Sequence, residues 1–188
     1  MARSWLGRNG LSLAVIVLSI AGIVWITLVS VLLDRAEAAP RIVEVPSGES
    51  IEIGGYTWKL DESNSVDGED LDTELVPEGG EMIGALLVVK PIEGATLTEE
   101  SCATELTAPS APPPSAEQRR VWATILTPSE FGYGLLPDST STCTPEGEAY
   151  QLESVFFTPA GVYDEATLDL TFLPGDNTVY RFALVPKD

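Results

Sequence analysis

The hydrophobic and polar positions divide the chain into two parts with different patterns. Residues 11–33 form an apolar run without a charged residue, Pro, Asn or Gln. At about 1.5 Å per residue, a helix over this run is roughly 34 Å long, enough to cross a ~30 Å hydrocarbon core. We therefore predict one transmembrane helix over residues 11–33. After Pro40 the apolar runs are short and separated by Gly, Pro, Asp and Ser, which is typical of an all-β domain.

Several of these short runs alternate between apolar and polar residues, as β-strands do. We expect strands at residues 42–45, 50–60, 84–92, 102–106, 119–126 and 150–158, and a closing hairpin with arms at 168–172 and 180–184. The apolar positions change parity within residues 50–60, so we expect a bulge or tight turn at Gly54 and Gly55. The unbroken apolar run Ala85–Val89 predicts a central strand buried on both faces.

Seven or eight short strands favour an all-β fold. We predict an immunoglobulin-like antiparallel β-sandwich, with a small β-barrel as the alternative. The predicted organisation is a cytoplasmic tail (1–10), a transmembrane helix (11–33), a linker (34–40) and an extracytoplasmic β-sandwich domain (41–188).

The distribution of charge predicts the orientation in the membrane. The chain has 29 acidic and 10 basic residues, and its net charge is −19. The tail before residue 11 contains Arg3 and Arg8 and no acid, so the positive-inside rule places the N-terminus in the cytoplasm and the domain outside the cell membrane. A cleaved secretory signal is the alternative, because Ala36-Glu37-Ala38 matches an A-x-A cleavage pattern. The apolar run is longer than a usual signal core, which favours a signal anchor.

The composition argues against several functions. The acidic domain repels nucleic acid, so we expect no nucleic-acid partner. The chain contains no histidine, which excludes Ser–His–Asp and Cys–His sites built from this chain alone. It also lacks a G-x-S-x-G elbow and the common phosphate-binding glycine loops. We therefore expect no catalytic residues and no enzymatic activity.

The two cysteines, Cys102 and Cys143, both lie in the predicted exported domain. An even number of cysteines outside the cytoplasm predicts a disulfide between them. A redox or metal-binding pair is the alternative, but the chain has neither a C-x-x-C motif nor a histidine to support it.

The segment 61–81 contains nine acids and no base. Hard cations such as Ca²⁺ bind clustered carboxylates near a glycine turn. A weak Ca²⁺ site is therefore a hypothesis, with the candidate ligands Asp67, Glu69, Asp70 and Asp72. A solvated acidic loop is the alternative, because the spacing does not match an EF-hand. Apart from this possible Ca²⁺, we expect no cofactor.

Two further segments are candidate recognition loops. The aromatic segment 131–136 either presents a recognition patch or tucks its aromatic rings over the edge of the sandwich. The Pro-rich segment 107–117, followed by Arg119 and Arg120, either docks a partner or a cell-wall polymer, or is a plain spacer.

The layout as a whole resembles a class of uncharacterised exported proteins of actinobacteria. The shared features are the basic tail, the signal anchor, a G-x-x-W strand with Gly55 and Trp58, the buried strand Ala85–Val89, the two outer cysteines and the closing hairpin. The resemblance implies an immunoglobulin-like domain facing the cell envelope. We expect a non-enzymatic, membrane-anchored interaction domain that binds an envelope protein. The alternative is a Ca²⁺-modulated or small-ligand-binding module that uses the acidic segment 61–81.

Overall fold

The computed structural model describes residues 18–20, 22, 23, 25, 40–71, 73, 75–95, 101–110, 119–143, 147–173 and 177–186. The chain forms two compact units, residues 1–39 and 40–188. The described residues of the first unit are helical. Within the described part of the chain, no helix is long and apolar enough to cross a membrane. Most of the predicted span 11–33 lies outside the described residues, so the transmembrane helix stays a prediction.

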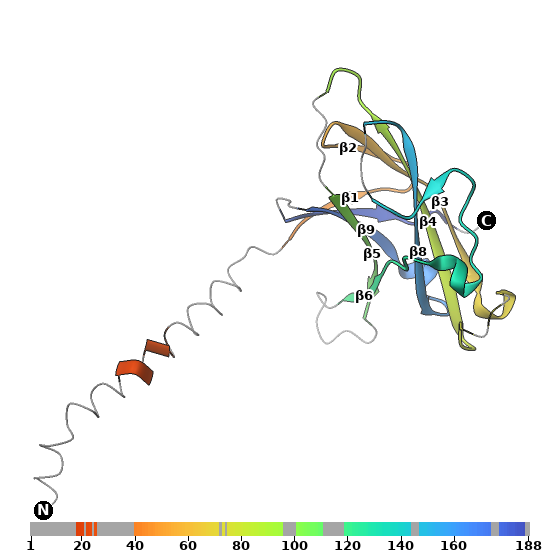
Figure 1. Cartoon of the computed structure of the whole chain (residues 1–188), viewed down its shortest axis with the longest axis horizontal. Coiled ribbons are helices and arrows are strands. Elements are labelled where there is room, and N and C mark those ends of the chain that lie inside the picture. The colour runs from red at the N-terminus through yellow and green to blue at the C-terminus, as the bar shows by residue number, and fades with distance from the viewer. Residues whose placement is uncertain are drawn as a thin grey trace, which may run out of the picture. The chain divides into compact units, whose positions relative to one another are not determined.

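The second unit is a β-sandwich of two five-stranded sheets (Figure 1). Sheet A has the order β1 (Arg41–Val45), β10 (Thr178–Ala183), β9 (Thr167–Leu173), β5 (Ser101–Pro109) and β6 (Arg119–Ala123). Sheet B has the order β2 (Ser50–Ile53), β3 (Tyr56–Asp67), β4 (Gly80–Pro91), β8 (Tyr150–Pro159) and β7 (Ser139–Thr140). Three short 3₁₀ helices complete the described elements: η1 (Gly68–Asp70), η2 (Pro128–Phe131) and η3 (Tyr163–Glu165).

The predicted β-sandwich is confirmed, and the two separate sheets do not form the barrel considered as the alternative. Neighbouring strands are antiparallel except for β1 with β10 and β7 with β8, which are parallel. The two-residue strand β7 was not predicted. The closing hairpin was predicted, and β9 pairs with β10 in antiparallel register.

The parity change within residues 50–60 is a two-residue hairpin turn. Gly54 and Gly55 have φ values of 60° and 83°, and Ile53 pairs with Tyr56 across the turn. Positive φ at both central residues is the geometry that joins adjacent strands most tightly, and glycine adopts it without steric cost. The tight-turn prediction is therefore confirmed.

The prediction that residues 61–81 form one acidic loop is wrong. β3 continues to Asp67 and β4 begins at Gly80, so only the middle of the segment connects strands. The register between β3 and β4 shifts once, between Leu60 and Glu62. Pairing with the apolar strand β4 outweighs the low strand propensity of the acidic sequence. In the same way, β5 extends through Pro109 into the segment that was predicted to be a Pro-rich loop.

The main core lies between the two sheets. Trp58 is fully buried and makes edge-to-face contacts with Phe172, at 5.3 Å between ring centroids, and with Tyr150, at 6.4 Å. Leu87, Leu152 and other apolar side chains of both sheets surround them. Such aromatic pairs contribute about 0.5–1.5 kcal/mol beyond the area that they bury.

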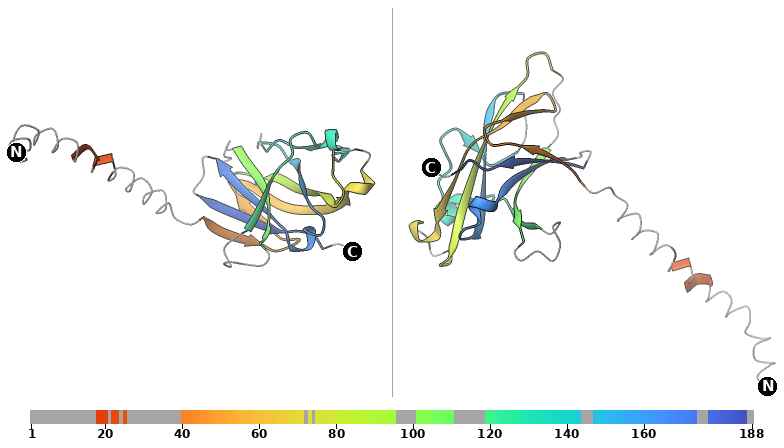
Figure 2. Two further views of the ribbon diagram at one scale, coloured as in Figure 1. Left: turned by 90° about the horizontal axis from the view of Figure 1, so that it is seen from below. Right: turned by 180° about the vertical axis from the view of Figure 1, so that it is seen from behind.

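A second apolar cluster covers the outer face of sheet B. The chain leaves β6, places η2 and the residues that follow it over this face, and then enters β7. The buried members of the cluster are Val76, Met82, Tyr133 and Val155. Both views of Figure 2 place η1 and η2 at the same end of the sandwich. This cover explains why β4 is buried on both faces, as its unbroken apolar run predicted.

Candidate functional site

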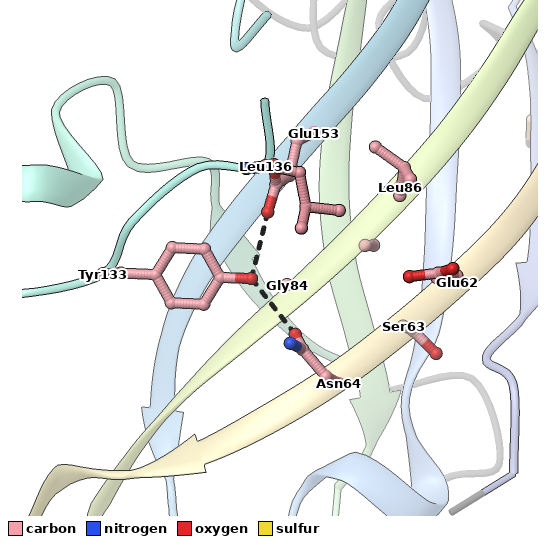
Figure 3. Close-up of a pocket in the computed structure, with 9 residues that line it drawn as sticks. Glu62, Ser63, Asn64, Gly84, Leu86, Tyr133, Leu136 and Glu153 are labelled. Carbon is pink, nitrogen blue, oxygen red and sulfur yellow. Dashed lines mark hydrogen bonds between the residues drawn. The ribbon is translucent and has the colours of Figure 1, made fainter. Parts of the chain in front are cut away.

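A small polar cavity lies on the outer face of sheet B, where β3, β4 and β8 run side by side (Figure 3). Its volume is about 50 Å³. Its lining residues are Glu62, Ser63, Asn64, Gly84, Ala85, Leu86, Tyr133, Leu136 and Glu153. The strands supply two adjacent cross-strand rows, Asn64–Gly84–Val155 and Glu62–Leu86–Glu153. The segment after η2 supplies Tyr133 and Leu136.

The carboxylate of Glu153 is the centre of this cluster, and its residue is 2% exposed. It accepts hydrogen bonds from the Tyr133 hydroxyl at 3.1 Å, the Leu136 backbone N–H at 2.7 Å and the Ser139 hydroxyl at 2.7 Å. A buried carboxylate is tolerated when several donors replace its hydration. Glu153 therefore fastens the segment 133–139 to the face of sheet B.

The Tyr133 hydroxyl lies between Glu153 and the Asn64 side-chain oxygen, which is also at 3.1 Å (Figure 3). A phenol has one hydrogen and donates it to one acceptor at a time. The charged carboxylate is the stronger acceptor. Burial, and then the neighbouring Glu153 charge, raise the pKa of Tyr133 above its ordinary value of 10.0. Tyr133 is consequently a protonated donor at neutral pH and not a base or nucleophile.

Gly84 makes room for this hydroxyl in the middle of β4. A Cβ at this position would overlap the Tyr133 hydroxyl and lie 2.6 Å from the Asn64 side-chain oxygen. Glycine inside a strand often marks such a close approach of another group. The absence of a side chain at Gly84 thus allows the polar contacts above it.

The size and bonding of the cavity limit what it can do. Ligand pockets for metabolites usually enclose about 300–1,000 Å³, whereas a cavity of ~10–15 Å³ already admits a water molecule. A volume of about 50 Å³ holds water but no metabolite-sized substrate. Because Tyr133 and Glu153 are already bonded to each other, the arrangement acts as a polar joint between the segment 133–139 and sheet B.

The predicted Ca²⁺ ligands do not meet in the described structure. Asp67 ends β3, Glu69 and Asp70 lie in η1, and all three are exposed, while Asp72 lies outside the described residues. Among the residues that are described, no three acidic or other metal-ligating side chains are grouped around one point. The Ca²⁺ hypothesis therefore stays a prediction.

Glu81 from the same acidic segment has a structural environment of its own. It is 2% exposed and accepts hydrogen bonds from the Val162 N–H at 3.0 Å, the Tyr163 N–H at 3.3 Å and the Thr158 hydroxyl at 3.3 Å. These donors hold the turn after β8 against the start of β4. The Glu81 carboxylate thus has a structural role in joining the turn to β4.

The predicted disulfide between Cys102 and Cys143 is present, with the Cα atoms 5.2 Å apart. Cys102 belongs to β5 in sheet A, and Cys143 follows β7 at the edge of sheet B. The Cys102 N–H also donates to the Cys143 carbonyl at 3.3 Å. The bridge therefore joins the two sheets and closes a loop that includes the chain segment covering sheet B.

The outer face of sheet A carries a charged cluster. Arg181 makes two hydrogen bonds to Asp169, at 2.8 Å and 2.7 Å, and lies 3.6 Å from Glu44. Arg119 donates to the Thr167 hydroxyl at 2.8 Å and to the Thr107 hydroxyl at 3.2 Å. Burial, and then the positive charge of Arg181, lower the pKa of Arg119. These contacts hold β10, β9, β5 and β6 together across the sheet.

The two candidate recognition loops have different outcomes. Tyr133 is buried against sheet B and Phe131 is half-buried, so the aromatic segment is tucked against the sandwich and is not a free patch. It covers the face of sheet B and not only its edge. Arg119 and Arg120 belong to β6, while residues 111–118 lie outside the described residues.

Sequence reasoning missed the residues at the centre of the polar cavity: Asn64, Gly84 and Glu153. The isolated glycine within the apolar run 82–89 and the acid within the apolar strand β8 were the available signals. Neither signal identifies its partner, because Tyr133 reaches both from a different part of the chain.

The comparisons with known proteins add no functional assignment. No protein-family model matches the chain, and no curated protein matches it. Among solved structures, the chain is similar to an uncharacterized β-sandwich protein from Clostridium difficile 630. The identity is 14% and the TM-score 0.42, and the match covers 79% of this chain and 98% of that one. At this level of similarity the match carries no argument, and the fold assignment rests on the two sheets themselves.

Proposed function

We propose that this protein is a non-enzymatic interaction domain of the cell envelope, anchored in the membrane by residues 11–33. The observation that carries the proposal is that the polar groups at the candidate site are hydrogen-bonded to one another. Glu153 accepts three hydrogen bonds from the fold itself, and the cavity beside it is only about 50 Å³. Buried polar groups that are bonded to one another are not available to a substrate, which supports a role through the surface of the domain.

Two observations support a location outside the cytoplasm. Disulfides persist in oxidising compartments, and Cys102 is bonded to Cys143. The N-terminal tail before the apolar run contains Arg3 and Arg8 and no acid, which favours a cytoplasmic N-terminus. We therefore propose a single-pass protein of the cell membrane with its β-sandwich outside.

We also infer that the sandwich is of the immunoglobulin type. The order β10-β9-β5-β6 corresponds to the G-F-C-C′ strands of that fold, and β3-β4-β8-β7 corresponds to A-B-E-D. Tyr163 lies between β8 and β9, where the fold often has a tyrosine corner. Its hydroxyl lies 2.6 Å from the Val185 carbonyl and 2.9 Å from the Ser63 carbonyl, which are distant in the chain and not just upstream as in that corner. Two features depart from that fold. β7 runs parallel to β8, and the disulfide joins β5 to the segment after β7 and not strands B and F.

Affinity capture tests the proposal most directly. The full-length chain, expressed in its native host, would be crosslinked in intact cells and purified from detergent-solubilised membranes. We expect a reproducible protein partner that a control chain consisting of residues 1–40 does not recover. Absence of any partner specific to the full chain, or turnover of a substrate by the purified protein, would contradict the proposed function.

A further inference from the structure

The edge strand β6 differs in charge from the rest of this acidic protein. Among the described strands of sheet A, β6 is the last and pairs with β5 alone. It begins with Arg119 and Arg120, whereas the whole chain has a net charge of −19. Within the described part of the chain, the ion pairs join Lys59 to Asp61 and Arg181 to Glu44 and Asp169. Neither arginine of β6 belongs to one of these ion pairs, although carboxylates are in large excess.

The side chains of β6 also expose apolar surface. Val121 is 55% exposed on the outer side of the strand. Arg120 lies over the half-buried ring of Trp122, 5.3 Å from its centroid, and donates to the Pro109 carbonyl at 3.2 Å. These contacts hold the guanidinium at the sheet edge. After Ala123 the chain turns away, and the Ile125 N–H donates to Val155 in sheet B. Residues 119–123 thus form a short edge with a fixed arrangement of positive and apolar groups.

From this arrangement we propose that β6 binds an extended, acidic segment of a partner protein, which adds a strand to sheet A. This inference rests on the proposed function and specifies the partner's chemistry. An edge strand offers backbone groups for such pairing, and side-chain complementarity selects the partner. The segment carries a carboxylate opposite Arg120 and an apolar residue opposite Val121. The Arg119 guanidinium is directed across β5 to Thr107 and Thr167, so it contributes only its positive charge. It carries no acid opposite Ala123, because Glu105 of β5 is paired with that residue.

Short peptides test this proposal on the full-length chain in neutral detergent micelles. The probe is a blocked, fluorescent peptide with the sequence Thr-Val-Val-Glu-Thr, tested together with its reverse to allow either strand direction. Two variant probes replace the Glu by Lys, or N-methylate alternate backbone nitrogens. We expect the acidic probe to bind in one direction, and both variant probes to lose binding.

Two charge reversals locate the binding site. Arg120→Glu should weaken binding of the acidic probe about tenfold, because it removes one attraction and adds a repulsion. Lys90→Glu makes the same change in charge at an exposed position on β4 and should leave the affinity within about twofold. Unfolding curves of both variants check that each stays folded, since Arg120→Glu also removes the contacts with Trp122 and the Pro109 carbonyl.

Several outcomes would overturn the proposal. These are no binding, equal binding of the lysine probe, or an unchanged affinity for Arg120→Glu. Undiminished binding of the N-methylated probe would show recognition by charge alone and contradict strand addition. Wild-type dimers that Arg120→Glu dissociates would show that a second copy occupies the edge instead. If the membrane partner is captured equally by wild type and Arg120→Glu, the proposed function stands and this inference fails.

Discussion

The two outer faces of the sandwich are stabilised in different ways. On sheet B, the chain itself covers the strands with the segment between β6 and β7, and a second apolar cluster forms beneath it. On sheet A, the outer face is held by the Arg181–Asp169 pair and its threonine neighbours. The difference explains the sequence patterns of the strands. β4, covered on both faces, is almost continuously apolar, whereas β9 alternates because its outer side chains are polar.

Removal of one partner from the charged cluster should have the largest effect. Asp169→Ala leaves Arg181 buried beside the positive charge of Arg119, with the exposed Glu44 as its remaining carboxylate neighbour. Breaking a buried ion pair in this way costs about 3–5 kcal/mol of unfolding free energy. Urea unfolding of the full chain in detergent, followed by tryptophan fluorescence, measures the loss. The double variant Asp169→Leu, Arg181→Met should lose less, and a single-variant loss below about 1 kcal/mol would show that the pair is effectively solvated.

Loss of the disulfide should act mainly on the cover of sheet B. The bridge closes a separation of 41 residues that includes the whole covering segment. In the chain-entropy model, removing it costs about 4 kcal/mol. The variant Cys102→Ser, Cys143→Ser should therefore unfold at lower urea, and amide exchange of residues 133–139 should accelerate more than that of β9. If amide exchange accelerated equally on both sheets, the bridge would stabilise the whole domain and not the cover of sheet B in particular.

Gly84→Ala tests the close approach beneath Tyr133. The added methyl group displaces the hydroxyl and weakens its bond to Glu153, so we expect a loss of about 2–3 kcal/mol. The same unfolding measurement applies. Tyr133→Phe in the same chain removes the hydroxyl that the added methyl group would contact, so the two losses should be less than additive. Strict additivity would show that the two residues do not interact.

Two tyrosines provide a matched pair for the same chemical change. The Tyr133 hydroxyl is bonded to Glu153, whereas the buried Tyr150 hydroxyl has no hydrogen-bond partner within the described part of the chain. Tyr133→Phe should cost about 1–2 kcal/mol, while Tyr150→Phe should be neutral or stabilising by up to ~1 kcal/mol. Comparison of the urea midpoints of the two variants measures this difference in stability. A larger loss for Tyr150→Phe would reverse the assignment of which hydroxyl supports the fold.

Raising the pH slightly above 10 should produce the smallest of these changes in the unfolding free energy. Burial raises the pKa of both Tyr133 and Tyr150 above the ordinary 10.0. Below pH 10 neither state ionises these groups, so their contribution to stability is fully present. Above pH 10 the unfolded chain loses the protons first, so the unfolding free energy falls as pH rises. A variant with both tyrosines replaced by Phe should show a shallower decline, and an unchanged slope would contradict the assignment.

Sequence patterns predicted most of the strands, since alternation and apolar runs report local burial. The hairpin turn at Gly54 and Gly55, the doubly buried strand at Ala85–Val89 and the closing hairpin were all found in this way. The errors occurred in residues 61–67 and 107–109, where acidic or Pro-containing segments are strands. Their pairing depends on a neighbour elsewhere in the chain, which local propensity does not include.

The sequence by itself determined a β-rich domain, its disulfide and its strong negative charge, because each follows from composition or short-range periodicity. Only the tertiary structure decided which face of each sheet is covered and which polar groups meet. Tyr133, Glu153 and Gly84 come from separate strands and a loop, and each is ordinary in its own segment. Their contact arises when the crossover from sheet A to sheet B places a side chain over a glycine. The position of β6 as the last described strand of sheet A likewise follows from the tertiary structure.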